Sequence, residues 1–286
     1  MSEYDILGKI MKNGILEGGE IWMFNHLLMV EEILGRKRGI VERLKERRSL
    51  RSAILKARSE GKRAIIAEVK RRGLREGESE VGKNPAQSVG ADAASVAKRM
   101  ERGGACAISV LTDEAFLGDL EDLRSVKLAV SVPVLRKDFI FDDFQVIEAF
   151  AHGADAVLLI ARFLSVDTLR SLAATAFSLG METLVEVDRT SVAKVLSADA
   201  SFASLIGINN RDLETLDVDL AVFEELAPSL KDAFPDVPLV AMSGIESGKD
   251  AERMFKAGAD AILVGTAIMK SEDIEGKVRE LVGNEA

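Results

Sequence analysis

The chain has 286 residues, which is enough for one large domain with an extension and a sizeable hydrophobic core. Its 47 Asp and Glu residues outnumber 38 Lys and Arg residues, and the net charge of -9 argues against a general nucleic-acid binder and favours a small partner. The single cysteine, Cys106, rules out an internal disulfide bond, and two histidines leave almost no material for a histidine-rich metal site or a Ser-His-Asp triad.

Residues 1–60 differ in pattern from the rest of the chain. They contain no run typical of a buried strand, and their apolar residues recur at helical spacing among Arg and Glu. The residues that set this pattern are Ile40, Val41, Leu44 and Leu50. We therefore expect a helical N-terminal extension over residues 1–60 and one domain over residues 61–286. The N-terminus shows no apolar signal segment and no uncharged stretch is long enough to span a membrane, so we expect a cytoplasmic protein without a membrane partner.

From Ala64 onward, short runs of Val, Ile, Leu and Ala alternate with amphipathic stretches. This alternation is typical of parallel strands that are buried on both faces and separated by helices. The predicted strands lie near residues 64–69, 106–111, 132–137, 156–161, 183–187, 205–209, 238–242 and 261–265. Eight strands of this kind indicate an α/β protein.

A weak internal repeat supports the count of eight. Gly104, Gly153 and Gly258 each precede a predicted strand in a similar five-residue motif, and each is expected to end a helix. The three copies are spaced by 49 and 105 residues, two and four times a βα unit of about 25 residues, which predicts a (β/α)8 TIM barrel with these glycines before strands 2, 4 and 8. The chain has no Gly-x-Gly-x-x-Gly motif after Ala67, which argues against a nucleotide-binding open sheet, but an open sheet without a nucleotide stays possible.

Polar side chains interrupt or close several of these runs, and the carboxyl ends of the strands are where such a barrel builds its active site. Glu68 and Lys70 lie two residues apart in the first run, so strand alternation places both on one face. Lys137 closes the third run. Glu186 lies between valines in the fifth run, where a carboxylate is costly to bury unless it is paired, and such groups often have shifted pKa values.

The sixth run repeats the arrangement. Gly207, Asn209 and Arg211 share one parity, and the small glycine is expected to leave room below the other two side chains. A basic residue at a strand end often only reaches water, so for Lys70, Lys137 or Arg211 alone a solvated role stays open.

Small residues follow the last two predicted strands. Ser243-Gly244 follows the seventh run and Gly265-Thr266 follows the eighth. Backbone N–H groups and a helix N-terminus can approach an anion closely at such positions, and this is the usual phosphate site of (β/α)8 barrels. The pair predicts phosphate binding, although either turn alone is a common structural feature.

Across residues 62–270 the chain resembles the indole-3-glycerol-phosphate synthase family. The motifs that carry the resemblance are Ala67-Glu68-Val69-Lys70, Ser109-Val110-Leu111-Thr112-Asp113 with Phe116 and Gly118, Leu135-Arg136-Lys137-Asp138-Phe139, Val185-Glu186-Val187, Gly207-Ile208-Asn209-Asn210-Arg211-Asp212-Leu213 and Ser243-Gly244-Ile245. The resemblance implies a TIM barrel with an N-terminal helical extension. It also implies ring closure of 1-(2-carboxyphenylamino)-1-deoxyribulose 5-phosphate to indole-3-glycerol phosphate, with loss of carbon dioxide and water and without a metal or organic cofactor.

The resemblance also implies roles for individual residues. Lys137 is expected to be the general acid that protonates the substrate carbonyl, and Glu186 and Lys70 are expected to move protons in the later steps, with the division between the two lysines left open. Glu68 and Asn209 would orient the lysines and the sugar hydroxyls. The expected substrate-binding residues are Arg211, which would face the anthranilate carboxylate, and the apolar pocket of Phe116, Phe139, Leu158 and Leu213; the expected phosphate-binding residues are Ser243, Gly244, Gly265 and Thr266.

The chain departs from the family pattern at two places. The family usually has Ser-Pro-Ser after the first-strand lysine, whereas residues 71–77 here are charged and contain two glycines. The family usually has glutamate before the Ser-Gly of the seventh strand, and here Met242 replaces it. We expect the second change to alter the rate or its pH profile without abolishing activity.

Two other functions stay open on sequence. Another phosphate-binding barrel such as phosphoribosylanthranilate isomerase would share the phosphate turns, but it is expected to use a Cys and Asp pair, and Cys106 lies at the apolar start of a strand. A non-catalytic barrel that binds a phosphorylated ligand is the second alternative. For all three readings we expect a monomer and no nucleic-acid partner.

Overall fold

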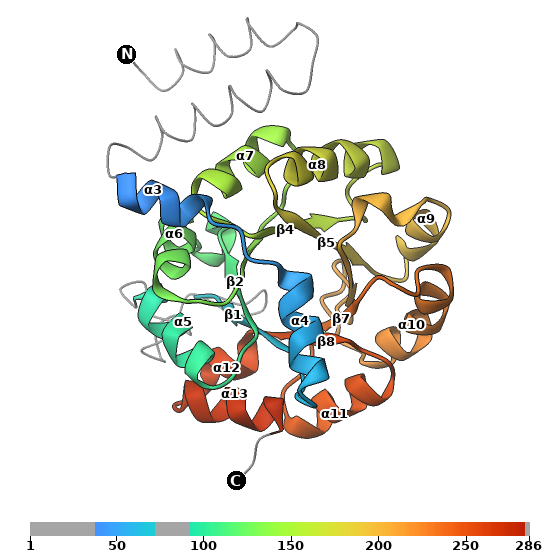
Figure 1. Ribbon diagram of the computed structural model, residues 1–286. Coiled ribbons are helices and arrows are strands. Elements are labelled where there is room, and N and C mark those ends of the chain that lie inside the picture. The colour runs from blue at the N-terminus through green and yellow to red at the C-terminus, as the bar shows by residue number, and fades with distance from the viewer. Residues whose placement is uncertain (1–37, 72–91, 284–286) are drawn as a thin grey trace, which may run out of the picture.

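The structure is a computed structural model that describes residues 38–71 and 92–283. Eight parallel strands pair in chain order, and β8 pairs with β1 to close the barrel (Figure 1). The strands are β1 Ile65–Val69, β2 Ala107–Leu111, β3 Val134–Lys137, β4 Ala156–Ile160, β5 Glu182–Val187, β6 Leu205–Asn209, β7 Leu239–Met242 and β8 Ala261–Val264. Each strand overlaps one of the eight predicted runs, so the predicted TIM barrel is confirmed and the open sheet is excluded.

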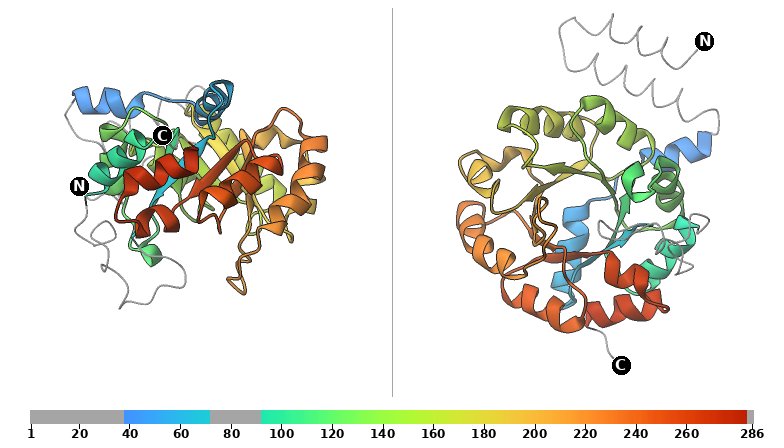
Figure 2. Two further views of the ribbon diagram at one scale, coloured as in Figure 1. Left: turned by 90° about the horizontal axis from the view of Figure 1, so that it is seen from below. Right: turned by 180° about the vertical axis from the view of Figure 1, so that it is seen from behind.

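Helices form a ring outside the barrel, as the view along its axis shows (Figure 2, right). They are α5 Ala93–Arg102, α6 Leu120–Ala129, α7 Asp143–Ala151, α8 Val166–Ser178, α9 Val192–Leu196, α10 Ala221–Ala233, α11 Gly248–Lys256, α12 Thr266–Lys270 and α13 Ile274–Val282, with short 3-10 turns η2 Glu114–Phe116 and η3 Ala200–Phe202. Nearly all strand residues are buried because one face packs on these helices and the other fills the barrel. This double burial explains the continuous apolar runs.

The three repeat glycines end helices, as predicted. Gly104, Gly153 and Gly258 follow α5, α7 and α11 and precede β2, β4 and β8. Their φ values of 103°, 89° and 100° lie in the left-handed region, which glycine reaches without steric cost. The repeat therefore marks the points where the chain turns from the outer ring back into the barrel.

Two helices of the predicted extension lie within the described residues, and residues 1–37 lie outside them. α3 Arg38–Lys45 contacts α6 and α7, and α4 Leu50–Ser59 lies across the amino end of the barrel (Figure 1). Leu50 and Ile54 of α4 are fully buried in the same cluster as Ala64 and Ile66 of the barrel interior. Because α4 closes this end, the cavity available for a ligand lies at the carboxyl ends of the strands. The domain boundary at residue 60 stays a prediction.

Candidate active site

A cavity of about 420 Å³ opens at the carboxyl ends of the strands. Every side chain or turn that the sequence analysis placed in the site lines it. Further lining residues that the sequence analysis did not single out are Leu111, Asp138, Ile160, Val218, Ile245, Glu246, Leu263, Val264 and Lys270. Leu111 and Ile160 end apolar runs and could have been found from their parity, whereas the approach of Val218, Glu246 and Lys270 depends on how loops and α12 fold.

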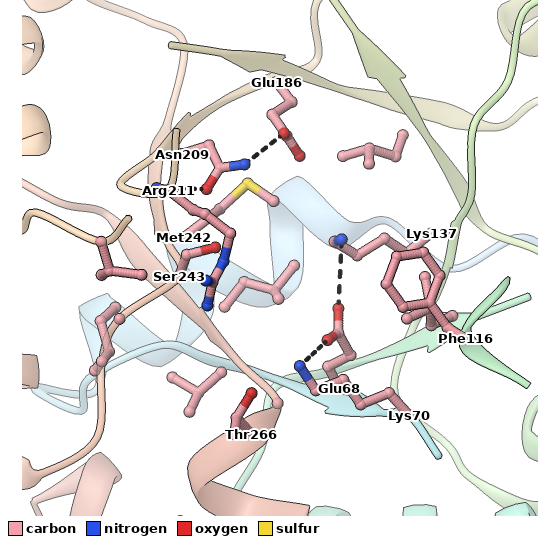
Figure 3. A pocket seen from close by; sticks show the side chains of 18 of the residues that line it. Glu68, Lys70, Phe116, Lys137, Glu186, Asn209, Arg211, Met242, Ser243 and Thr266 are labelled. Carbon is pink, nitrogen blue, oxygen red and sulfur yellow. Dashed lines mark hydrogen bonds and ion pairs between the residues drawn. The ribbon is translucent and has the colours of Figure 1, made fainter. Parts of the chain in front are cut away.

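Glu68 lies between Lys70 and Lys137, two of the lysines that line the cavity (Figure 3). Its Oε1 is 3.8 Å from Lys70 Nζ and its Oε2 is 3.8 Å from Lys137 Nζ. The Glu68 side chain is 6% exposed, and it packs so closely on Gly265 that a Cβ there would lie 2.5 Å from Oε1. The glycine of the eighth-strand turn therefore also makes space for this carboxylate. The geometry brings two cations and one anion from β1 and β3 into a single group.

The residues on either side of Lys137 hold its strand end in place. Arg136 and Asp138 are buried, and the Arg136 Nη2 donates to Asp138 Oδ2 at 2.9 Å. The Thr112 hydroxyl donates to the same oxygen at 2.5 Å, and the Phe139 N–H donates to Asp138 Oδ1 at 2.8 Å. These bonds tie the end of β3 to the end of β2. Because side chains alternate along a strand, Lys137 then points into the cavity while Arg136 points away from it.

Glu186 is 4% exposed on the cavity floor, and Asn209 of the next strand donates to its Oε1 at 2.7 Å (Figure 3). Loss of water raises the pKa of Glu186, while the positive charge of Lys137 and the Asn209 hydrogen bond partly oppose that rise. Asn209 in turn accepts the Arg211 backbone N–H at 3.0 Å. A carboxylate whose pKa is raised in this way is a stronger base than one exposed to water, which suits it to accept a proton.

The sequence analysis expected Gly207 to leave free space below Asn209 and Arg211. That space is filled, so the expectation is wrong. Met242 is paired with Asn209 in the β6–β7 register, and its Sδ occupies the place where a side chain at position 207 would lie. The thioether is 2% exposed, so the position that the family usually gives to a carboxylate is occupied by an apolar group on the cavity floor. Parity alone could not reveal this because the filling atom comes from the neighbouring strand.

An aromatic wall lies on the β2–β3 side of the cavity. The rings of Phe116 and Phe139 are stacked with centroids 6.3 Å apart, and Phe139 also contacts Phe163 at 6.3 Å. Leu158 and Leu213 add apolar lining. Phe163, on the loop after β4, extends the wall and was not predicted, because an isolated aromatic residue in a loop carries no periodic signal.

The two predicted phosphate turns meet at the opposite side of the cavity. Ser243 and Gly244 have φ values of 68° and 79°, and the Asn210 side chain donates to the Ser243 carbonyl oxygen at 3.2 Å. Val218 leaves no space for a side chain at Gly244. Gly265 stands at the start of α12, with Thr266 as its first residue. Consecutive left-handed residues and a helix start present backbone N–H groups in the manner of an anion-binding nest.

Two sequence features lie away from this chemistry or outside the described residues. Cys106 precedes β2 at the amino end of the barrel, and burial raises the pKa of its thiol to about 12, which makes it a poor acid or nucleophile. This placement removes the support for a mechanism based on a Cys and Asp pair. Of the altered loop, only Arg71 is described, where it pairs with Asp122 at 2.8 Å; residues 72–77 lie outside the described part.

Two kinds of feature are absent from the described residues. Within 38–71 and 92–283, no three His, Cys, Asp or Glu side chains gather closely enough to hold a metal ion. In the same ranges, no helix has the length and apolar character needed to cross a bilayer. The expectation that no cofactor is needed stays a prediction.

Comparison with known proteins identifies relatives over most of the chain. The profile of the family described as indole-3-glycerol phosphate synthase matches residues 30–281. The indole-3-glycerol phosphate synthase of Kineococcus radiotolerans is 46% identical over 233 residues, which cover 80% of this chain and 80% of that protein. The enzyme of the same name from Geobacillus kaustophilus is 41% identical over 266 residues, which cover 90% of this chain and 98% of that protein.

Solved structures support the fold. Tryptophan synthase from M. tuberculosis aligns with a TM-score of 0.60 at 14% identity, covering 83% of this chain and 98% of that chain. Thiamine phosphate pyrophosphorylase from Pyrococcus furiosus aligns with a TM-score of 0.55 at 20% identity, covering 82% and 96%. At these identities the likeness concerns the barrel alone.

Proposed function

The chain belongs to the indole-3-glycerol phosphate synthase family, and on that premise we propose which side chains of its cavity act in the reaction. The activity is that of a carboxy-lyase in tryptophan biosynthesis. It closes the ring of 1-(2-carboxyphenylamino)-1-deoxyribulose 5-phosphate with loss of carbon dioxide and water. The substrate is thus a small phosphorylated aromatic molecule. The net charge of -9 supports our proposal that no nucleic acid takes part. The single cysteine fits a reducing compartment, and we propose that the protein acts in the cytoplasm, as a monomer.

Binding of the two ends of the substrate is the first role we assign. The phosphate is held by the backbone N–H groups of Ser243-Gly244 and Gly265-Thr266, and the aromatic ring lies against Phe116 and Phe139, with Leu158 and Leu213 completing its pocket. The phosphate is remote from the reacting carbons, so its binding energy can hold the sugar in a conformation that brings its carbonyl carbon to the ring.

Carbon–carbon bond formation is the step for Lys137. As the aromatic carbon attacks the sugar carbonyl, the Lys137 ammonium donates a proton to the carbonyl oxygen and offsets the charge that develops on it. Glu68, 3.8 Å away, keeps this ammonium directed into the cavity. Arg211 faces the anthranilate carboxylate, which departs as neutral carbon dioxide beside an apolar wall.

Loss of water requires a proton acceptor and a proton donor. Glu186, with its raised pKa, takes a proton from the ring-closed intermediate, and Asn209 fixes the direction of that carboxylate through the 2.7 Å hydrogen bond. Lys70 is close to Glu68 on the same wall and is placed to protonate the departing hydroxyl. Acid–base groups placed in this way typically contribute about 10² to 10⁴ in rate.

The observation that carries the proposal is the arrangement of Glu68, Lys70, Lys137 and Glu186 in one cavity with the two phosphate turns. Its test is turnover of the carboxyphenylamino ribulose phosphate, followed by the appearance of indole absorbance. We expect product from the unaltered chain and a fall of about 10²-fold or more in kcat for Lys137→Ala. Lys98→Ala removes an exposed lysine on α5 and is the matched control, expected to leave turnover unchanged. Tight binding of the substrate without product would instead support a binding module, and full activity of Lys137→Ala would refute the assigned role.

A further inference from the structure

Two buried polar atoms on the interior side of β1 and β2 have no hydrogen-bond partner. They are Glu68 Oε2 and Ser109 Oγ, and Ser109 is fully buried. A buried polar atom without a partner is costly, so natural proteins seldom keep one unless it has a use. Two such atoms on neighbouring strands indicate that the pair is completed in another state of the site.

The strand register places Ser109 directly beside Glu68. Glu68 is paired with Ser109 across β1 and β2, and Leu111, two residues further along β2, lines the cavity and is paired with Lys137 of β3. Ser109 has the same parity as Leu111 and therefore faces the barrel interior. Since β2 lies between β1 and β3, the Glu68–Lys137 ion pair crosses β2 between the positions of Ser109 and Leu111.

The chemistry of the two groups is complementary. An ionised carboxylate only accepts hydrogen bonds, and a serine hydroxyl can donate one after a rotation about a single bond. The charged groups near Glu68 are Lys70 directly after β1, Lys137 on β3 and, further across the floor, Glu186 on β5. Lys270 of α12 lines the same cavity. When a substrate draws the ammonium of Lys137 towards its carbonyl oxygen, Glu68 Oε2 loses its nearest cation and needs a donor.

We propose that Ser109 is a positioning residue whose hydroxyl donates to Glu68 Oε2 in the ligand-bound site, which holds that carboxylate aimed between Lys70 and Lys137. The proposal rests on the proposed function, because it concerns a step in which Lys137 engages the substrate. If the Ser109 hydroxyl donates to Glu68 only when a ligand is bound, both atoms are expected to lack a partner in the free protein. Neither the resemblance nor the cavity lining assigns any role to Ser109.

The kinetic test compares Ser109→Ala with the unaltered chain. We expect kcat to fall by about 10- to 100-fold, as for a lost hydrogen bond to a charged group, and the acidic limb of the pH–rate profile to move up by about one pH unit. Ser109→Thr, which keeps the hydroxyl, should restore part of the rate, and Ser109→Cys, a weak donor of similar size, should not. The thermal midpoint of Ser109→Ala should stay the same or rise, because the hydroxyl it removes has no partner in the free protein.

Thr183→Val is the matched control. The Thr183 hydroxyl is equally buried but donates to the Phe202 carbonyl oxygen at 2.7 Å, so its removal should lower the thermal midpoint and leave the pH–rate profile unchanged. An unchanged profile for Ser109→Ala, in a chain whose turnover is lost with Lys137→Ala, would overturn the role of Ser109 and leave the proposed function standing.

A second readout does not depend on turnover. A crystal structure with indole-3-glycerol phosphate bound should place Ser109 Oγ within about 3 Å of Glu68 Oε2. A separation beyond hydrogen-bond distance in that complex would overturn the proposal, whatever the activity of the chain.

Discussion

At the amino end of the barrel Asp155 accepts hydrogen bonds from Lys127 Nζ at 2.6 Å and from the backbone N–H groups of Arg48 and Val134 at 2.8 Å. At the carboxyl end Glu68 is about equally buried, yet its two lysines lie 3.8 Å away and one of its oxygens has no hydrogen-bond partner. A buried carboxylate beside lysine thus has all its hydrogen bonds at the amino end, which we call saturated, and lacks some at the carboxyl end, which we call unsaturated. A saturated group stabilises the fold, whereas an unsaturated one keeps capacity to bind a substrate.

The saturated arrangement occurs twice, in the internal repeat. Asp155 and Asp260 occupy the same position in their Gly-Ala-Asp-Ala motifs. Each accepts the N–H of the first residue of the preceding strand and a lysine of the helix before that strand, with Lys231 at 2.5 Å and the Leu239 N–H at 2.8 Å for Asp260. Both also bind the segment around α4, through the Arg48 backbone and the Arg58 side chain. The repeat therefore fastens the N-terminal helices to the barrel.

Removing the Asp155 carboxylate should give the largest loss of stability of the proposed variants. It should also show most clearly that the amino end contributes to stability and the carboxyl end to activity. Asp155→Ala leaves the Lys127 ammonium buried without its anion, which should lower the free energy of unfolding by about 3–5 kcal/mol. Urea unfolding measures this, and kcat well below the unfolding transition should stay unchanged. Glu60→Ala breaks an exposed ion pair and is the control, with little or no effect expected.

The pH dependence of that loss is fixed by Lys127. Burial already lowers the pKa of Lys127 to about 8, against the attraction of Asp155. Above pH 8 the unfolded lysine keeps a proton that the folded one releases, so the unfolded state binds more protons and stability rises with pH. In the variant the loss of Asp155 lowers the folded-state pKa of Lys127 further, so stability should begin to recover below pH 8 and continue to rise up to about pH 10. If Asp155→Ala lowers the free energy of unfolding by less than about 1 kcal/mol at neutral pH, the Asp155 hydrogen bonds at the amino end do not stabilise the fold as we propose.

Adding a carboxylate at the carboxyl end should have a smaller effect, on rate rather than stability. Met242→Glu restores the group that the family usually carries there, near Glu186 and beside Asn209. A second negative charge raises the pKa of Glu186 further, so its ionised form is lost at a higher pH and the acidic limb of the pH–rate profile moves up. We expect a change of less than about tenfold at the optimum. Met242→Gln controls for shape, and identical profiles for the two variants would contradict the electrostatic explanation.

The sequence alone was sufficient to predict the barrel and to predict which face of its strand most site residues occupy. Apolar runs and the glycine repeat located eight strands, and parity put Glu68 and Lys70 on one wall, because both signals depend only on neighbours along the chain. It could not show that the Met242 side chain fills the space at Gly207 or that Ser109 lies beside Glu68, since both depend on the stagger between strands. Nor did it reveal that the aspartates of the repeat bind the N-terminal segment, because their partners there, Arg48 and Arg58, lie 107 and 202 residues away.

The most direct test of the central claim is a crystal structure of the chain with its phosphorylated aromatic substrate or product. The account predicts phosphate between Ser243-Gly244 and Gly265-Thr266, the aromatic ring against Phe116 and Phe139, and Lys137 and Glu186 both within reach of the reacting atoms. A ligand seated with its phosphate among the lysines, or with Glu186 turned away from it, would contradict the account.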